Sequence, residues 1–136
     1  MSKFPDWFKR AYKQWSQSQP GEEDFLAFCD LLGYAPAIVL NWLQGEAIPQ
    51  GAELLSIAGV LGTKVYEILG QAAPDPELVK IYNSFSHLNG EPRSKLALAL
   101  YEVELRLKAE KLSVKSNQAK KIFEVIFANY GLNKSQ

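Results

Sequence analysis

The sequence predicts an all-α protein, and three observations lead to this prediction. Apolar residues recur three and four positions apart along the chain, which is the spacing of one face of an α-helix. Glycines stand where several of these periodic segments stop, as they commonly do just after the last turn of a helix. No segment shows a sustained alternation of apolar and polar residues between turn signals, which is the pattern of a strand.

The first two helices are expected from an aromatic stripe and from a capping residue. The stripe predicts a helix from Phe4 to about Gln17, and the polar run SQSQPGEE after it is typical of a loop. Asp24 is suited to cap a second helix that reaches Leu32, and Gly33 to end it in the left-handed conformation. The stripe consists of Phe4, Trp7, Phe8, Ala11, Tyr12 and Trp15.

Three further helices are expected before residue 70. Proline is tolerated in the first turn of a helix, so Pro36 suits the start of a third helix that Gly45 ends. A fourth helix is expected over about 50–61 and a short fifth over 64–69, each followed by a glycine. Five short helices of this kind would form one compact unit.

The segment QAAPDP, residues 71–76, predicts a boundary, because two prolines two residues apart resist helix and favour an extended linker. Three helices are expected after it, over about 76–88, over about 93–112, and from a break near 113–116 to Tyr130. We therefore expect a domain at 1–70, a linker at 71–76 and a helical region at 77–136.

Composition excludes several classes of function. The single cysteine, Cys29, allows no intramolecular disulfide framework, and the single histidine, His87, leaves no His–Cys metal cluster and few acid–base constellations. No phosphate loop, nucleophile elbow or dinucleotide fingerprint occurs, so we expect neither an enzyme nor a cofactor. The start of the chain does not resemble a signal peptide, and the longest apolar run, 34–40, is shorter than the ~20 residues of a membrane span. A cytoplasmic location without membrane contact is expected.

Charge is unevenly distributed, although the formal net charge is zero. Residues 14–63 contain no Lys or Arg and carry Glu22, Glu23, Asp24, Asp30, Glu46 and Glu53. From residue 106 onward the sign reverses, with Arg106, Lys108, Lys111, Lys115, Lys120, Lys121 and Lys134 against Glu110 and Glu124. An anionic partner would therefore prefer the two ends of the chain to its middle.

Residues 24–69, DFLAFCDLLGYAPAIVLNWLQGEAIPQGAELLSIAGVLGTKVYEIL, resemble the Xre family of helix-turn-helix regulators, whose fold is that of the lambda-type phage repressors. The resemblance lies in a short helix ending LG, a second helix ending in glycine, a proline four residues later, and a leucine-rich helix that runs into LG and EIL. It implies a lambda-repressor-like five-helix N-terminal domain, here followed by a three-helix C-terminal extension. The positions that the family keeps in its core are Phe28, Cys29, Leu32, Val39, Trp42, Leu54, Ile57, Ala58, Leu61, Val65, Ile68 and Leu69.

The same resemblance implies a function, that of a sequence-specific DNA-binding regulator of transcription. In the family the third helix, here 36–44, enters the major groove of double-stranded DNA. The residues that match its contacts are Pro36, Ala37, Ile38 and Asn41 at base edges and Gln44 and Lys64 at the backbone.

A second interpretation stays open, because the third helix is mostly apolar. Phe25 and Glu46 stand where the family often has a glutamine and a lysine, and each missing cation removes a contribution to DNA affinity from counterion release. The alternative is a degenerate helix-turn-helix that serves as a protein–protein interaction or assembly module without DNA binding. Its partner would contact Leu40 and Leu43, which the family usually exposes.

The long helix expected from residue 93 is apolar on two sides, and a helix of this kind must bury both. Because helix-turn-helix proteins commonly read two half-sites as dimers, we expect one side to form a homodimer interface. A single intramolecular bundle is the other interpretation. One side carries Leu96, Leu100, Val103 and Leu107, and the side assigned to the dimer carries Leu98, Tyr101, Leu105 and Leu112.

Overall fold

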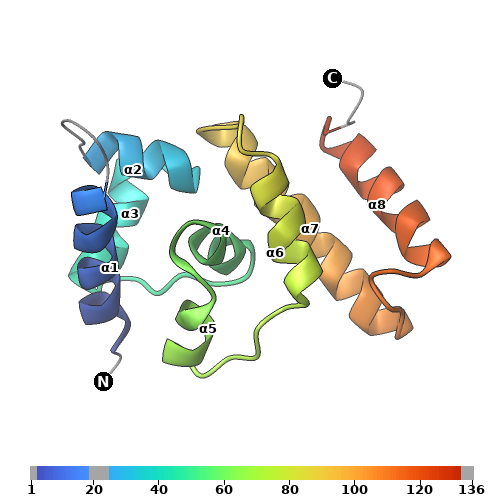
Figure 1. The fold of residues 1–136 in the computed structure, drawn as a ribbon, viewed down its shortest axis with the longest axis horizontal. Helices are drawn as coiled ribbons and strands as arrows, with labels where there is room; N and C mark the ends of the chain where they lie inside the picture. Colours follow the sequence, from blue (N-terminus) through green and yellow to red (C-terminus); the bar gives the residue numbers. More distant parts are fainter. Residues whose placement is uncertain (1–2, 19–24, 133–136) are drawn as a thin grey trace.

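The structure is a computed structural model that describes residues 3–18 and 25–132. Over these residues the chain forms eight α-helices and no strand, which confirms the all-α prediction (Figure 1). Asp24, the expected cap of the second helix, lies outside the described residues. The helices are α1 (Phe4–Ser18), α2 (Phe25–Leu32), α3 (Pro36–Gln44), α4 (Ala52–Leu61), α5 (Lys64–Ile68), α6 (Pro76–Ser84), α7 (Glu91–Glu110) and α8 (Asn117–Asn129).

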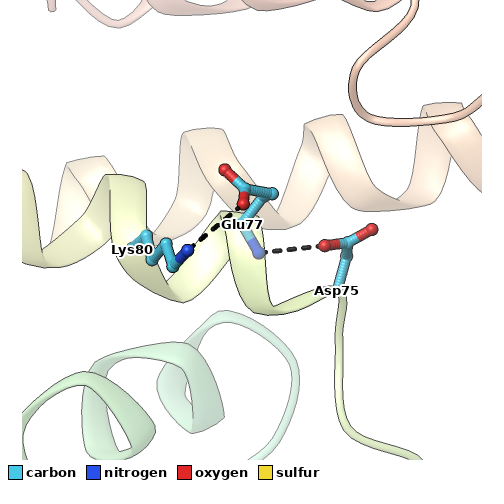
Figure 2. A network of polar contacts seen from close by, with 3 residues as sticks. All are labelled: Asp75, Glu77 and Lys80. Carbon is cyan, nitrogen blue, oxygen red and sulfur yellow. Dashed lines mark hydrogen bonds and ion pairs between the residues drawn. The ribbon is translucent and has the colours of Figure 1, made fainter.

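The start of α6 is fixed by local hydrogen bonds after segment 71–75, which forms neither helix nor strand. The carboxylate of Asp75 accepts a hydrogen bond from the backbone amide of Glu77, with 2.9 Å between Oδ1 and N (Figure 2). Glu77 in turn pairs with Lys80, with 3.5 Å between Oε2 and Nζ. Pro76 occupies the first helical position, where the missing N–H costs nothing.

The helix α6 is shorter than predicted, and α7 keeps its predicted length but is shifted by two residues. The apolar spacing predicted α6 to reach residue 88, but it ends at Ser84, and α7 spans 91–110 instead of 93–112. The buried Arg93 explains the early end, because its Nη1 donates to the backbone carbonyls of Phe85 and Leu88, both at 3.2 Å. These carbonyls are thus satisfied in a turn instead of a further turn of helix.

The first hydrophobic core joins α1, α2, α3, α5 and one face of α4. The ring of Phe8 stacks on Phe4 with 5.1 Å between centroids and meets Trp42 edge-on at 6.0 Å. Of the twelve expected core positions, Leu61, Ile68 and Leu69 are half-buried against this core and the other nine are buried. The buried members are Phe4, Phe8, Phe28, Cys29, Leu32, Val39, Trp42, Leu54, Ile57, Ala58, Val65 and Tyr66.

The second core joins α6, α7 and α8 with the opposite face of α4, so that α4 lies between the two cores (Figure 1). The first apolar side of α7 is buried here within the chain, as a bundle requires. On the second side, Leu98 and Leu105 are exposed, Tyr101 is half-buried and Leu112 packs partly against this core. The buried members are Ala52, Leu55, Leu78, Tyr82, Leu96, Ala97, Ala99, Leu100, Val103, Leu107, Ala119, Ile122 and Ile126.

A buried polar chain runs from one core to the other. The hydroxyl of Ser56 on α4 donates to the hydroxyl of Tyr34 at 3.4 Å. It also lies near the hydroxyl of Tyr82 on α6, where it partly offsets the rise in the Tyr82 pKa that burial causes. Nε of Arg93 donates to the same Tyr82 hydroxyl at 3.1 Å, and the guanidinium lies over the Tyr82 ring, 4.5 Å from its centroid. Because burying these groups without partners would be costly, the chain favours one fixed arrangement of α4, α6 and α7.

Candidate interaction groove between α3 and α7

The first turn of α7 rests on the turn between α2 and α3. The chain bends by 101° between α2 and α3 at this turn, where Gly33 has a left-handed φ of 92°. A Cβ atom at Gly33 would lie 2.8 Å from the backbone nitrogen of Ser94, so only glycine allows this approach. The amide of Gly90 donates to the carbonyl of Asp30 at 2.8 Å. These contacts hold the N-terminal half of α7 beside α3.

All residues that match the family's DNA contacts are exposed. Val39 and Trp42 turn into the first core, which leaves the opposite face of α3 open to solvent. The two residues of the alternative interpretation differ, because Leu40 is exposed whereas Leu43 is half-buried against the first core. The exposed positions are Pro36, Ala37, Ile38, Asn41 and Gln44 on α3 and Lys64 on α5.

A groove of about 800 Å³ lies between α3 and α7. Ile38 and Asn41 line it from α3, and Leu98 and Tyr101 line it from α7. The ring of Tyr101 reaches the α3–α4 loop at Gly51, where an added Cβ atom would lie 3.3 Å away. The structure thus brings two expected base-contacting residues and two expected dimer residues into one surface. Gln44, Lys64 and Leu105 do not line the groove.

The charged side chains along this groove are acidic. Glu53 at the start of α4 is the one charged residue among the described residues that line it, and its Oε1 accepts a hydrogen bond from the amide of Gln50 at 2.9 Å. A smaller hollow of about 390 Å³ continues along the α2–α3 turn and adds Asp30 and Glu91. Burial, with a smaller effect of the nearby Glu53 carboxylate, raises the pKa of Tyr34 to about 12. An anion in the groove would meet no lysine or arginine among these lining residues.

The sequence predicts the base-contacting residues one by one, but it does not predict the groove, because the α7 wall of the groove lies more than 40 positions away along the chain. Two features of the sequence indicate the groove once the fold is known. Gly33 marks the close approach of α7 to the α2–α3 turn, and Leu98 with Leu105 marks an apolar side of α7 that its own bundle does not use.

Other chemistry finds little support in the described residues. No group of three or more His, Cys, Asp or Glu side chains in the described ranges is placed to hold a metal ion. Cys29 is buried, and burial followed by the charge of Asp30 raises its thiol pKa to about 11, so the thiol is neutral at ordinary pH. Over the same ranges, no single helix is long and apolar enough to cross a membrane. No family model matches the chain, and no curated protein or solved structure matches it at a significant level.

Proposed function

We propose that this chain is a protein–protein interaction or assembly module, and that the groove between α3 and α7 is its binding surface. The observation that carries the proposal is the charge of the groove, whose charged neighbours are Glu53, Asp30 and Glu91. DNA affinity rests largely on Lys and Arg contacts to phosphate, and carboxylates near the backbone oppose it. Binding to a protein surface does not require Lys or Arg residues in the groove.

The apolar side chains around the groove support the same proposal. Ile38 is 38% exposed, Ile48 43% and Leu98 45%, and all three line this one groove. Single exposed apolar residues are common on proteins, but several gathered around a concave surface are typical of interaction sites. Asn41 and Gln50 add amide groups that can hydrogen bond to a partner's backbone.

The arrangement of the first five helices supports a helix-turn-helix origin of the module. The 101° bend between α2 and α3 falls in the range of about 90–120° that is usual for this motif. The glycine at the turn and the buried Val39 and Trp42 agree with the expected lambda-repressor-like arrangement. On this proposal the fold is kept, and the exposed face of α3 serves a different partner.

A DNA-binding regulator is the second candidate, because the first turn of α3 is open to solvent. Ala37 and Ile38 are suited to touch a thymine methyl group, and Asn41 to pair with adenine. Gln44 and Lys64 would then contact the backbone. This candidate needs further cations near α3 to hold the duplex, and the residues lining the groove do not provide them.

The proposal is tested by comparing capture by the wild-type chain and by Ile38→Glu. The immobilised chain is exposed to lysate of the organism that encodes it, and bound proteins are identified by mass spectrometry. We expect at least one protein that wild type retains and Ile38→Glu loses, because a carboxylate would enter the apolar part of the groove. The matched control is Val125→Glu on α8, which is 59% exposed and does not line the groove.

Capture that Val125→Glu loses and Ile38→Glu keeps would contradict a role for this groove. The role of the groove would also be contradicted if the capture of no protein, including a further copy of the chain, depended on Ile38. Both variants must keep the far-ultraviolet circular dichroism spectrum of the wild type, so that loss of binding is not loss of fold.

A further inference from the structure

We infer that the groove binds a second copy of this chain, with the α7 helices of the two copies packed antiparallel. This inference rests on the proposed interaction function and adds the identity and orientation of the partner. Three features of α7 carry it: an open apolar seam, a groove that continues this seam, and a charge pattern that is complementary to itself only when the helix is reversed.

The open seam of α7 has the spacing of a helix–helix interface. Leu98, Tyr101 and Leu105 follow one another at intervals of three and four residues, which is the repeat of a coiled-coil seam. Leu98 is 45% exposed and Leu105 48%, whereas the other apolar side of α7 is buried in the second core. Helix α7 therefore has one apolar side that packs within its own chain and a second apolar side that stays exposed to solvent.

The groove gives this seam a defined place for a partner side chain. Ser94, Leu98 and Tyr101 form its α7 wall, and Leu105 stands on the same side of α7 beyond the groove. In an antiparallel pair, the seam residues of the two helices meet in successive layers. In the proposed register, Leu98 of each copy packs against Tyr101 of the other. The same register brings Leu105 of each copy to Ser94 of the other, which is inside the groove. An apolar side chain then covers Ile38 and Leu98, which the isolated chain leaves exposed.

Charge on the exposed side of α7 favours the antiparallel direction. In this register Lys95 faces Glu102 of the second copy, and Glu91 faces the turn that carries Arg106 and Lys108. All five are exposed. Within their own chain, Arg106 and Lys108 also pair with Glu110 and Glu104, and Glu102 accepts a hydrogen bond from the Tyr130 hydroxyl. A parallel pair in register would instead place Glu91 against Glu91, because Glu91 stands seven residues before Leu98 on the same seam, and this is unfavourable. Antiparallel packing also aligns the two helix dipoles favourably.

The first measurement is the mass of the intact chain by light scattering after size-exclusion chromatography. We expect a species of twice the 15.2 kDa chain mass for the wild type and for Val125→Lys. The double variant Leu98→Lys/Leu105→Lys should run as a folded monomer, with a dissociation constant raised by more than about tenfold. A monomeric wild type, or a dimer unchanged in the double variant, would overturn the inference.

Disulfide trapping then tests the direction of the pairing. Chains carrying Ser94→Cys and Leu105→Cys are mixed and oxidised, and we expect cross-linked dimers in the mixture alone. In the antiparallel register two copies of residue 94 stand about 16 Å apart along the helix axis, too far for a disulfide, and so do two copies of residue 105. Cross-linking of Ser94→Cys by itself would show a parallel pair and overturn the proposed direction. The native Cys29 is buried and does not take part.

The two proposals fail in different ways. If the wild type is a monomer while capture of another protein still depends on Ile38, the inference about the second copy is wrong and the interaction function stands. If the wild type is an antiparallel dimer that buries Leu98 and Leu105, both stand. If it is a monomer and nothing depends on Ile38, both are wrong.

Discussion

At Gly59 the absence of a side chain allows α6 to pack closely on α4. A Cβ atom built there would lie 2.3 Å from Cδ2 and 2.5 Å from Cε2 of Tyr82, whose ring is fully buried. The Tyr82 ring cannot move away easily, because its hydroxyl accepts a hydrogen bond from Arg93 and the Arg93 guanidinium lies over the ring. The sequence alone does not predict this contact, since a glycine within a helical pattern indicates a close approach only when the neighbouring helix is known.

The variant Gly59→Ala should therefore destabilise the fold, although alanine favours helix. We expect a loss of about 1–3 kcal/mol in the free energy of unfolding from overpacking, offset by a gain of up to about 1 kcal/mol in helix propensity. Chemical denaturation monitored by circular dichroism measures the difference. The double variant Gly59→Ala/Tyr82→Leu should lose less than the sum of the two single changes, and strict additivity would contradict the contact.

The half-buried Tyr34 predicts a loss of stability at high pH. Burial raises its pKa from 10.0 to about 12, so the unfolded chain loses the phenolic proton at lower pH than the folded chain. The free energy of unfolding should therefore be insensitive to this group below its unfolded pKa and fall as pH rises from about 10 to 12. Tyr34→Phe should flatten that fall when denaturation is measured across this range. An unchanged slope would show that Tyr34 does not contribute to it.

At the scale of helices, the sequence predicted the order of all eight elements and most of their ends. Local signals sufficed for α3, whose first proline and final glycine lie as expected. They failed at the end of α6, because the side chain of Arg93, eight residues beyond Phe85, satisfies a carbonyl that would otherwise favour a further turn. The sequence assigned Leu112 to the dimer interface, but Leu112 packs partly on the second core of its own chain. Helix α8 contributes to this core, and its position cannot be predicted from the residues of α7 alone.

The Asp75 cap gives a prediction for α6 as an element. Asp75→Ala removes the acceptor for the Glu77 amide and should lower the free energy of unfolding by about 1 kcal/mol. Asp75→Asn keeps an oxygen acceptor and should lose much less, which makes it the matched control. Thermal unfolding of the two variants beside the wild type provides the comparison. Equal losses for both would mean that charge, and not capping, accounts for the effect.

At the scale of the whole molecule, α4 ties the two halves of the chain together. Its Leu54 and Ile57 belong to the first core, and its Ala52 and Leu55 to the second. The Pro-containing segment 71–75 separates the halves in sequence, but α6 and α7 return to pack on α4. The sequence alone could not predict the groove for this reason, because the position of α7 beside α3 follows from packing between segments far apart in the chain.

The central claim is that the exposed face of α3 contacts protein and not DNA, and DNA titration tests it most directly. Fluorescence anisotropy of labelled random and genomic DNA fragments is measured with the wild-type chain at salt concentrations of about 50 mM and about 200 mM. Because the groove beside Asn41 is bordered by Glu53, Asp30 and Glu91, we expect no binding that weakens with salt. Binding at low salt that falls steeply at high salt and is lost in Asn41→Ala would contradict the claim and establish the DNA-binding candidate.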